Sequence, residues 1–166
     1  MTYREGRVFV FDKETLETVK EMKMPKEMEE GWGLTHDSKF LYSSDGTNRI
    51  FKINASDFSV VDIIEVKDKH GKAIHYINEL ELVGDYIYGN ILPLNVVVKI
   101  NKDTGIIDKV YDFKKLYDIQ MQFVRDKKIY WDSSNNVMNG IAFRKSTNTF
   151  LITGKEYNFI FEVKLF

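Results

Sequence analysis

Apolar and polar residues alternate along most of this chain, in short runs that recur at regular intervals. Three five-residue runs share one pattern and end on Asp or Asn, at residues 8–12, 50–54 and 97–101. Each of them leads through a turn-forming segment into a second alternating run. Alternation with a period of two residues places apolar side chains on one face of a β-strand. The pattern therefore predicts a series of β-hairpins.

A further strand is predicted upstream of each of the later runs. Residues 40–46 precede the run at 50–54, residues 86–90 precede the run at 97–101, and residues 149–155 precede a final strand. The complete unit would be four short antiparallel strands over about 45 residues, a period typical of a propeller blade.

The stretch over residues 75–90 shows how such a unit begins. It reads as two short strands joined by a tight turn at Gly84. Its first strand carries Asn78, Glu79 and Glu81 among apolar neighbours, and polar groups in a half-buried strand are costly unless something binds them. The same opening recurs in looser form at residues 30–34 and 139–143. We expect these openings to be equivalent in space.

The chain begins and ends part-way through a repeat unit, which predicts an incomplete propeller. Residues 1–28 hold the outer two strands of a blade, 29–67 and 76–113 form complete blades, and 138–166 hold the inner three strands of another. Residues 114–137 are expected to form an inserted loop or short helix. The predicted fold is therefore all-β, one β-propeller domain to which this chain supplies about three blades. Since closure takes at least about four blades, the rest would come from a longer protein or a second chain.

An open β-meander is the alternative to a propeller, although it would leave large apolar faces exposed.

The length, net charge and cysteine content of the chain exclude further classes of protein. The chain has 166 residues, a formal net charge of −1 and no cysteine. Such a charge gives no electrostatic basis for binding nucleic acid or an anionic membrane surface. No stretch reaches the roughly 18 apolar residues of a membrane helix, and the three histidines lack metal-ligand spacing.

A shared polar site follows from the repeat. The innermost strand of each blade lines the channel of a propeller, so the symmetry predicts that the polar ends of these strands converge on one axis. The residues concerned are Glu30, Trp32, Asp45, Asn78, Glu79, Asn90, Asn139 and Lys155. Scaffold roles stay open from the residues alone: the asparagines could satisfy buried backbone, Trp32 could pack between blades, and Lys155 could be a solvated turn residue.

Five short motifs stand in order across residues 29–166: Glu30-Gly31-Trp32-Gly33-Leu34-Thr35, Ser44-Asp45-Gly46-Thr47, Ile77-Asn78-Glu79-Leu80-Glu81, Met138-Asn139-Gly140-Ile141-Ala142 and Thr153-Gly154-Lys155. Their order and spacing resemble the plant-type glutaminyl cyclases, or glutamine cyclotransferases. The resemblance implies a five-bladed propeller whose first two blades would precede residue 1. It also suggests a secretory location.

The resemblance implies an aminoacyltransferase that needs no metal or cofactor. Its substrate would be a peptide or protein with an N-terminal glutamine, which is converted to pyroglutamate with release of ammonia. By the same resemblance, Asn78 would hydrogen-bond the substrate amide or amine and Lys155 would stabilise the oxyanion. Trp32 would form an aromatic wall, and Leu92 stands where the family usually has a tryptophan. The family's principal acid/base glutamate would lie in the two preceding blades.

The substrate-binding candidates are Glu30, Trp32, Leu92 and Asn139, beside the catalytic candidates Asn78 and Lys155. Two rival functions remain. Oxygen ligands from Glu30, Asn78 and Asn139 could hold Ca²⁺ in a metal-dependent propeller hydrolase. The chain could also belong to a non-catalytic propeller that binds peptides.

Overall fold

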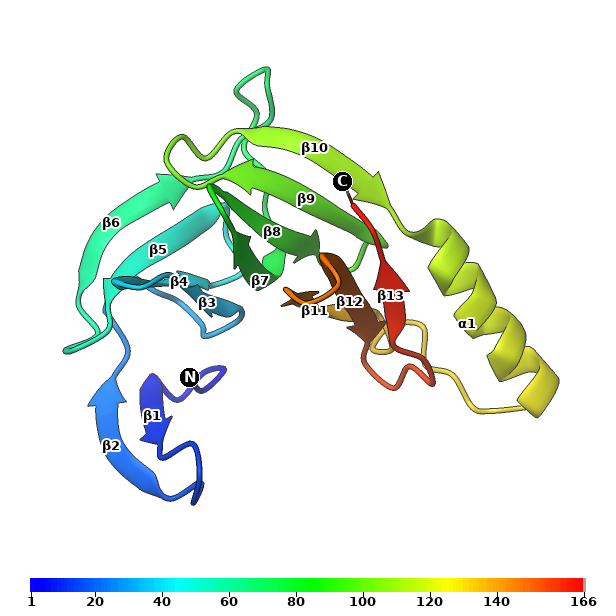
Figure 1. Ribbon diagram of the computed structural model, residues 1–166, viewed down its shortest axis with the longest axis horizontal. Helices are drawn as coiled ribbons and strands as arrows, with labels where there is room; N and C mark the ends of the chain where they lie inside the picture. The colour runs from blue at the N-terminus through cyan, green and yellow to red at the C-terminus, as the bar shows by residue number, and fades with distance from the viewer. Residues whose placement is uncertain (166) are drawn as a thin grey trace.

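The protein consists of antiparallel β-sheets and one helix in a computed structural model that describes residues 1–165 (Figure 1). The first sheet pairs β1 (Arg7–Phe11) with β2 (Thr18–Lys23). The second has the order β3 (Leu34–His36), β4 (Phe40–Ser44), β5 (Arg49–Asn54) and β6 (Val60–Glu65). The third runs through β7 (Ile77–Val83), β8 (Tyr86–Ile91), β9 (Val96–Asn101) and β10 (Ile107–Asp112). The fourth contains β11 (Met138–Arg144), β12 (Thr149–Gly154) and β13 (Phe161–Val163).

The all-β prediction is confirmed at this level: four sheets whose strands pair with their neighbours in sequence. Figure 1 shows the sheets following one another along an arc, with β3, β7 and β11 on its inner side. Within residues 1–165 no sheet closes on itself. The prediction for residues 138–166 extends to Phe166, which lies outside the described residues.

The Asp or Asn that ends each repeated run makes the following turn. The side-chain oxygen of Asn101 accepts hydrogen bonds from the backbone N–H groups of Asp103 and Thr104, both at 3.0 Å. Asp12 and Asn54 accept equivalent bonds at the ends of β1 and β5. These side chains compete with the sheet for backbone donors, which is why the strands end there.

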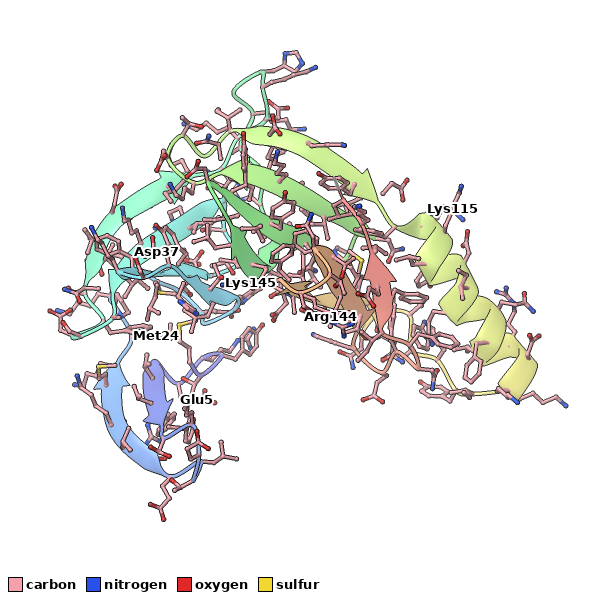
Figure 2. The ribbon with its side chains drawn as sticks, viewed as in Figure 1. Glu5, Met24, Asp37, Lys115, Arg144 and Lys145 are labelled. Atoms are coloured by element: carbon pink, nitrogen blue, oxygen red, sulfur yellow. The ribbon has the colours of Figure 1, made fainter. Side chains whose placement is uncertain are left out.

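The core lies between successive sheets rather than inside any one of them. Neighbouring residues of one strand face different layers: Ile50 packs toward the third sheet, while Phe51 packs toward the first. In the same way Ile87 faces the second sheet and Tyr88 faces the fourth. Figure 2 shows side chains filling the space between the sheets. The second and third sheets are thus buried on both faces. This packing fixes how β3, β7 and β11 approach one another.

Helix α1 (Lys114–Lys127) occupies the connection before β11. It is attached to the segment after β12 through Gln120, whose side-chain nitrogen donates to the Asn158 side chain at 2.9 Å. The Asn158 backbone N–H donates back to Gln120 at 3.0 Å. Lys115 points outward from the helix in Figure 2. No helix in residues 1–165 has the length and apolar character to cross a membrane.

Candidate active site

A pocket of about 270 Å³ opens at the inner ends of the second, third and fourth sheets. Its lining combines polar, charged and aromatic side chains from segments far apart in sequence. The lining residues are Tyr3, Gly31, Trp32, Asn78, Glu79, Leu92, Asn139 and Lys155. Five of the six residues singled out as catalytic or substrate-binding candidates therefore meet at one place. Glu30 is the exception.

Asn78 is held from the neighbouring sheet by its backbone. Ser44 Oγ donates to the Asn78 carbonyl at 2.6 Å and accepts from the Gly33 N–H at 2.8 Å. Gly33 has no room for a side chain, because an added Cβ would collide with that carbonyl. The Asn78 side chain is only 6% exposed and makes no hydrogen bond within residues 1–165. Since buried amides are normally paired, this one is available to a ligand in the pocket.

Glu79 places a carboxylate beside that amide. Burial raises the pKa of Glu79, and the nearby positive charge of Lys155 pulls that pKa down by a smaller amount. In the described chain this carboxylate has neither a hydrogen bond nor an ion pair. Its neighbour Glu81 differs, because Glu81 Oε1 accepts from the Phe143 backbone N–H at 3.0 Å. Glu79 can therefore exchange a proton with a ligand, whereas Glu81 joins two sheets.

Lys155 and Asn139 also line the pocket. The Lys155 backbone N–H donates to the Val137 carbonyl at 2.9 Å, which fixes the start of the side chain, while its ammonium has no carboxylate within salt-bridge distance among residues 1–165. The side-chain oxygen of Asn139 is buried without a hydrogen-bond partner. Together with Asn78, these groups give the pocket two amides and one free cation.

Trp32 forms a wall whose orientation is fixed on both sides. Its indole N–H donates to Glu30 at 2.7 Å, and Arg4 Nε donates to the other oxygen of the same carboxylate at 2.9 Å. The hydrogen bond from Trp32 is the main reason that the pKa of Glu30 lies below its usual value. The ring covers Gly46, where an added Cβ would lie 2.6 Å from the indole. Glu30 thus supports the wall from behind and does not line the pocket.

Asp45 and Asn90, which we expected near the same axis, are occupied by the scaffold. Asn90 Oδ1 accepts from the Glu79 backbone N–H at 3.0 Å, and Asn90 Nδ2 donates to the Met138 carbonyl at 2.8 Å. One side chain thereby connects β7, β8 and β11. The Asp45 carboxylate accepts from Arg49 at 3.1 Å and from the Thr47 side chain in the turn after β4.

The sequence placed Glu79 near the shared axis but gave it no chemical role, and it gave no indication of Tyr3. The signal for Glu79 was a charged residue in a half-buried inner strand. Tyr3 lies outside the repeat, and its place depends on a backbone hydrogen bond from Gly31 N–H to its carbonyl at 3.1 Å. Among residues 1–165, no three His, Cys, Asp or Glu side chains gather where a metal ion could bind. Both oxygens of Glu30, a proposed calcium ligand, already accept hydrogen bonds.

Comparison with known proteins now gives the family. The sequence model described as glutamine cyclotransferase matches residues 1–165. The chain belongs to the glutamine cyclotransferase family. A glutaminyl-peptide cyclotransferase of Arabidopsis thaliana is 27% identical over 158 residues, which cover 95% of this chain and 46% of that protein.

Solved structures agree with the family. The crystal structure of Myxococcus xanthus glutaminyl cyclase superposes with a TM-score of 0.85 at 27% identity, covering 98% of this chain and 65% of that one. The computationally designed Ika4 protein reaches a TM-score of 0.51 at 11% identity over 98% of this chain and 82% of its own, a likeness of fold alone. The chain spans about half the length of its Arabidopsis relative.

Proposed function

We propose that this chain forms the substrate pocket of a glutaminyl-peptide cyclotransferase. The supporting observation is that Asn78 and Lys155, the residues to which the family resemblance gives catalytic roles, line the same pocket although they come from different sheets. Its substrate would be a peptide or protein with a free N-terminal glutamine, and its products pyroglutamyl peptide and ammonia.

In the proposed reaction, the glutamine α-nitrogen attacks its own side-chain carbonyl carbon. A C–N bond forms to close the five-membered ring, and the carbonyl electron pair moves onto oxygen. The oxyanion electron pair then re-forms the carbonyl double bond as the C–N bond to the side-chain nitrogen breaks, and the proton lost by the amine leaves with that nitrogen as ammonia. Nucleophile and electrophile belong to one residue, so the protein mainly has to select the ring-closing conformer and move one proton.

The pocket residues suit these tasks. The Lys155 ammonium would stabilise the oxyanion, and the Asn78 amide, which can donate and accept, would orient the carboxamide. Glu79 would hydrogen-bond the neutral α-amine and carry the proton that this amine loses on attack to the leaving nitrogen, since a carboxylate with a raised pKa is a better base near neutral pH. Trp32 would cover the apolar methylenes of the glutamine side chain.

Replacement of Lys155 by alanine tests this assignment. We expect kcat for ammonia release from a Gln-initiated peptide to fall by about 10²–10³, the usual cost of one oxyanion-stabilising group. Lys115→Ala is the matched control, because Lys115 lies on α1 and outside the pocket (Figure 2). Ammonia release that survives in Lys155→Ala would contradict the assignment.

The same assay separates the rival functions. Peptide binding without ammonia release from the wild-type protein would favour the non-catalytic propeller. Loss of activity after chelation of divalent cations would favour the calcium-dependent hydrolase.

We also propose that the four sheets are consecutive parts of a five-bladed propeller. Support comes from β3, β7 and β11, which lie on the inner side of one arc, and from the coverage of 65% of the Myxococcus chain. The remaining strands would come from a longer protein or a second chain. They would cover apolar side chains that β1, β2 and their turn expose, among them Phe11, Leu16 and Val19.

A further inference from the structure

A second pocket, of about 300 Å³, adjoins the first and has a different chemical character. The two share Tyr3, Trp32, Leu92 and Lys155 as a common boundary. Beyond this boundary the second pocket is lined by Tyr76, Pro93, Ser134, Asn135 and Val137. It contains no carboxylate, and Lys155 supplies its single charge. A mainly apolar chamber therefore opens directly from the polar one.

Tyr76 is the most prominent wall of this second pocket. Its side chain is 59% exposed, and its backbone has a φ of 62°, a conformation that bulky residues seldom adopt. Hydrogen bonds fix that backbone: Tyr76 N–H donates to the Gly46 carbonyl and Leu92 N–H donates to the Tyr76 carbonyl, both at 2.9 Å. An exposed ring is thus presented beside Leu92 by a backbone tied to two sheets.

We propose that the second pocket binds the side chain of the residue that follows the N-terminal glutamine, and that it selects apolar or aromatic side chains at that position. This inference rests on the proposed cyclotransferase function. When the glutamine side chain occupies the polar chamber, the next residue begins about 3.8 Å away along the chain and has to leave across the shared boundary. There it meets Tyr76, Pro93 and Val137.

The chemistry of the residues that line the second pocket determines which side chains it should prefer at the position after the glutamine. Burial of an aromatic ring against Tyr76 and Pro93 is favourable because it removes apolar surface from water. A basic side chain would meet the positive charge of Lys155. Phenylalanine or leucine should therefore be preferred to glycine, and lysine should be the poorest second residue.

The test compares kcat/KM for Gln-Phe-amide, Gln-Gly-amide, Gln-Glu-amide and Gln-Lys-amide in the full protein. We expect Gln-Phe-amide to exceed Gln-Gly-amide by about tenfold or more, the range of discrimination typical of an apolar pocket. In Tyr76→Ala this ratio should fall to within about threefold of unity. Tyr130→Ala should keep the wild-type ratio, because Tyr130 is 87% exposed and lines neither pocket.

Failure of this inference is distinguishable from failure of the proposed function. Equal kcat/KM for all four peptides, a preference for Gln-Glu-amide, or an unchanged ratio in Tyr76→Ala would overturn the inference and leave the cyclotransferase standing. If no peptide releases ammonia, the proposed function fails. Fluorescence quenching of Trp32 by pyroglutamyl-Phe-amide and pyroglutamyl-Gly-amide, measured in Trp131→Phe, then decides the inference. Equal affinities for the two would overturn it.

Discussion

Glu79 and Glu81 occupy alternate positions of one strand, yet their carboxylates have different partners. Burial raises the pKa of both, but only Glu81 accepts a hydrogen bond from the scaffold. At the scale of the single residue, this contrast separates a group that serves the fold from one that is free to serve a reaction. Charge alone could not separate them in the sequence, because their partners come from other sheets.

Replacement of Glu79 by glutamine should reduce kcat/KM for a Gln-initiated peptide by about 10²–10⁴, the usual contribution of a general base. The wild-type rate should fall as the pH drops, and this fall should begin above the pH at which an ordinary glutamate titrates, because burial raises the pKa of Glu79. Rate measurements from pH 4 to about pH 8 test both statements.

The same replacement of Glu79 by glutamine should raise the thermal stability of the protein although it lowers the activity. Because the folded-state pKa of Glu79 is raised, its charge destabilises the folded protein above that pKa, and the penalty disappears below the unfolded pKa. Glu79→Gln should therefore melt at a higher temperature than wild type at pH 7, with a smaller difference at pH 4. Glu81→Gln is the control and should retain activity. A Glu79→Gln protein that is fully active, or unstable at pH 7, would contradict this account.

At the scale of the element, strand β7 is positioned by its neighbours on both sides. Ser44 holds it from the second sheet through the Asn78 carbonyl, and Asn90 ties it to β11 through Met138. Alternation in the sequence is enough to predict that β7 is a strand. It is not enough to predict these cross-sheet bonds, since they depend on how closely the sheets approach.

Replacement of Asn90 by alanine should lower the free energy of unfolding by about 2–4 kcal/mol, because two buried backbone groups lose their partner at about 1–3 kcal/mol each. Asn90 is 1% exposed, so water cannot replace the lost bonds. Urea denaturation measures the difference. Asn101→Ala is the matched control: its turn lies at the surface, where water can bond the freed groups, and it should cost about 1 kcal/mol or less. Equal losses in the two variants would contradict the bridging role of Asn90.

The helix and the N-terminal segment make contacts that the sequence pattern does not predict. Residues 114–137 fall outside the strand repeat, so the sequence predicts only an inserted loop or short helix there and not the pairing of Gln120 with Asn158. Tyr3 has no repeat position at all and reaches the pocket through Gly31. The sequence could predict periodic elements and the residues at equivalent places in them. It could not predict contacts made by segments that occur once.

At the scale of the whole molecule, the exposed apolar residues of the first sheet are the surface that we expect further strands to cover. If further strands complete a propeller, native mass spectrometry of the active protein should show either a longer chain or a second one bound to this one. Charged replacements at Phe11 and Val19, both more than half exposed, should weaken that association. The paired replacement of Tyr130 and Leu94, also exposed but outside the first sheet, should leave it unchanged. A fully active single chain of 19.5 kDa would contradict the proposal.

The pocket takes its walls from three sheets and from the segment before β1, so no single sheet of this chain would carry it. Exchange of one sheet for that of a relative would also change the cross-sheet hydrogen bonds of Ser44 and Asn90, which position β7. Tyr76, beside Leu92, is where a single replacement would reshape the entrance without touching Asn78 or Lys155. Under the proposed function, substrate preference could then change at this rim while the proposed catalytic residues stay fixed.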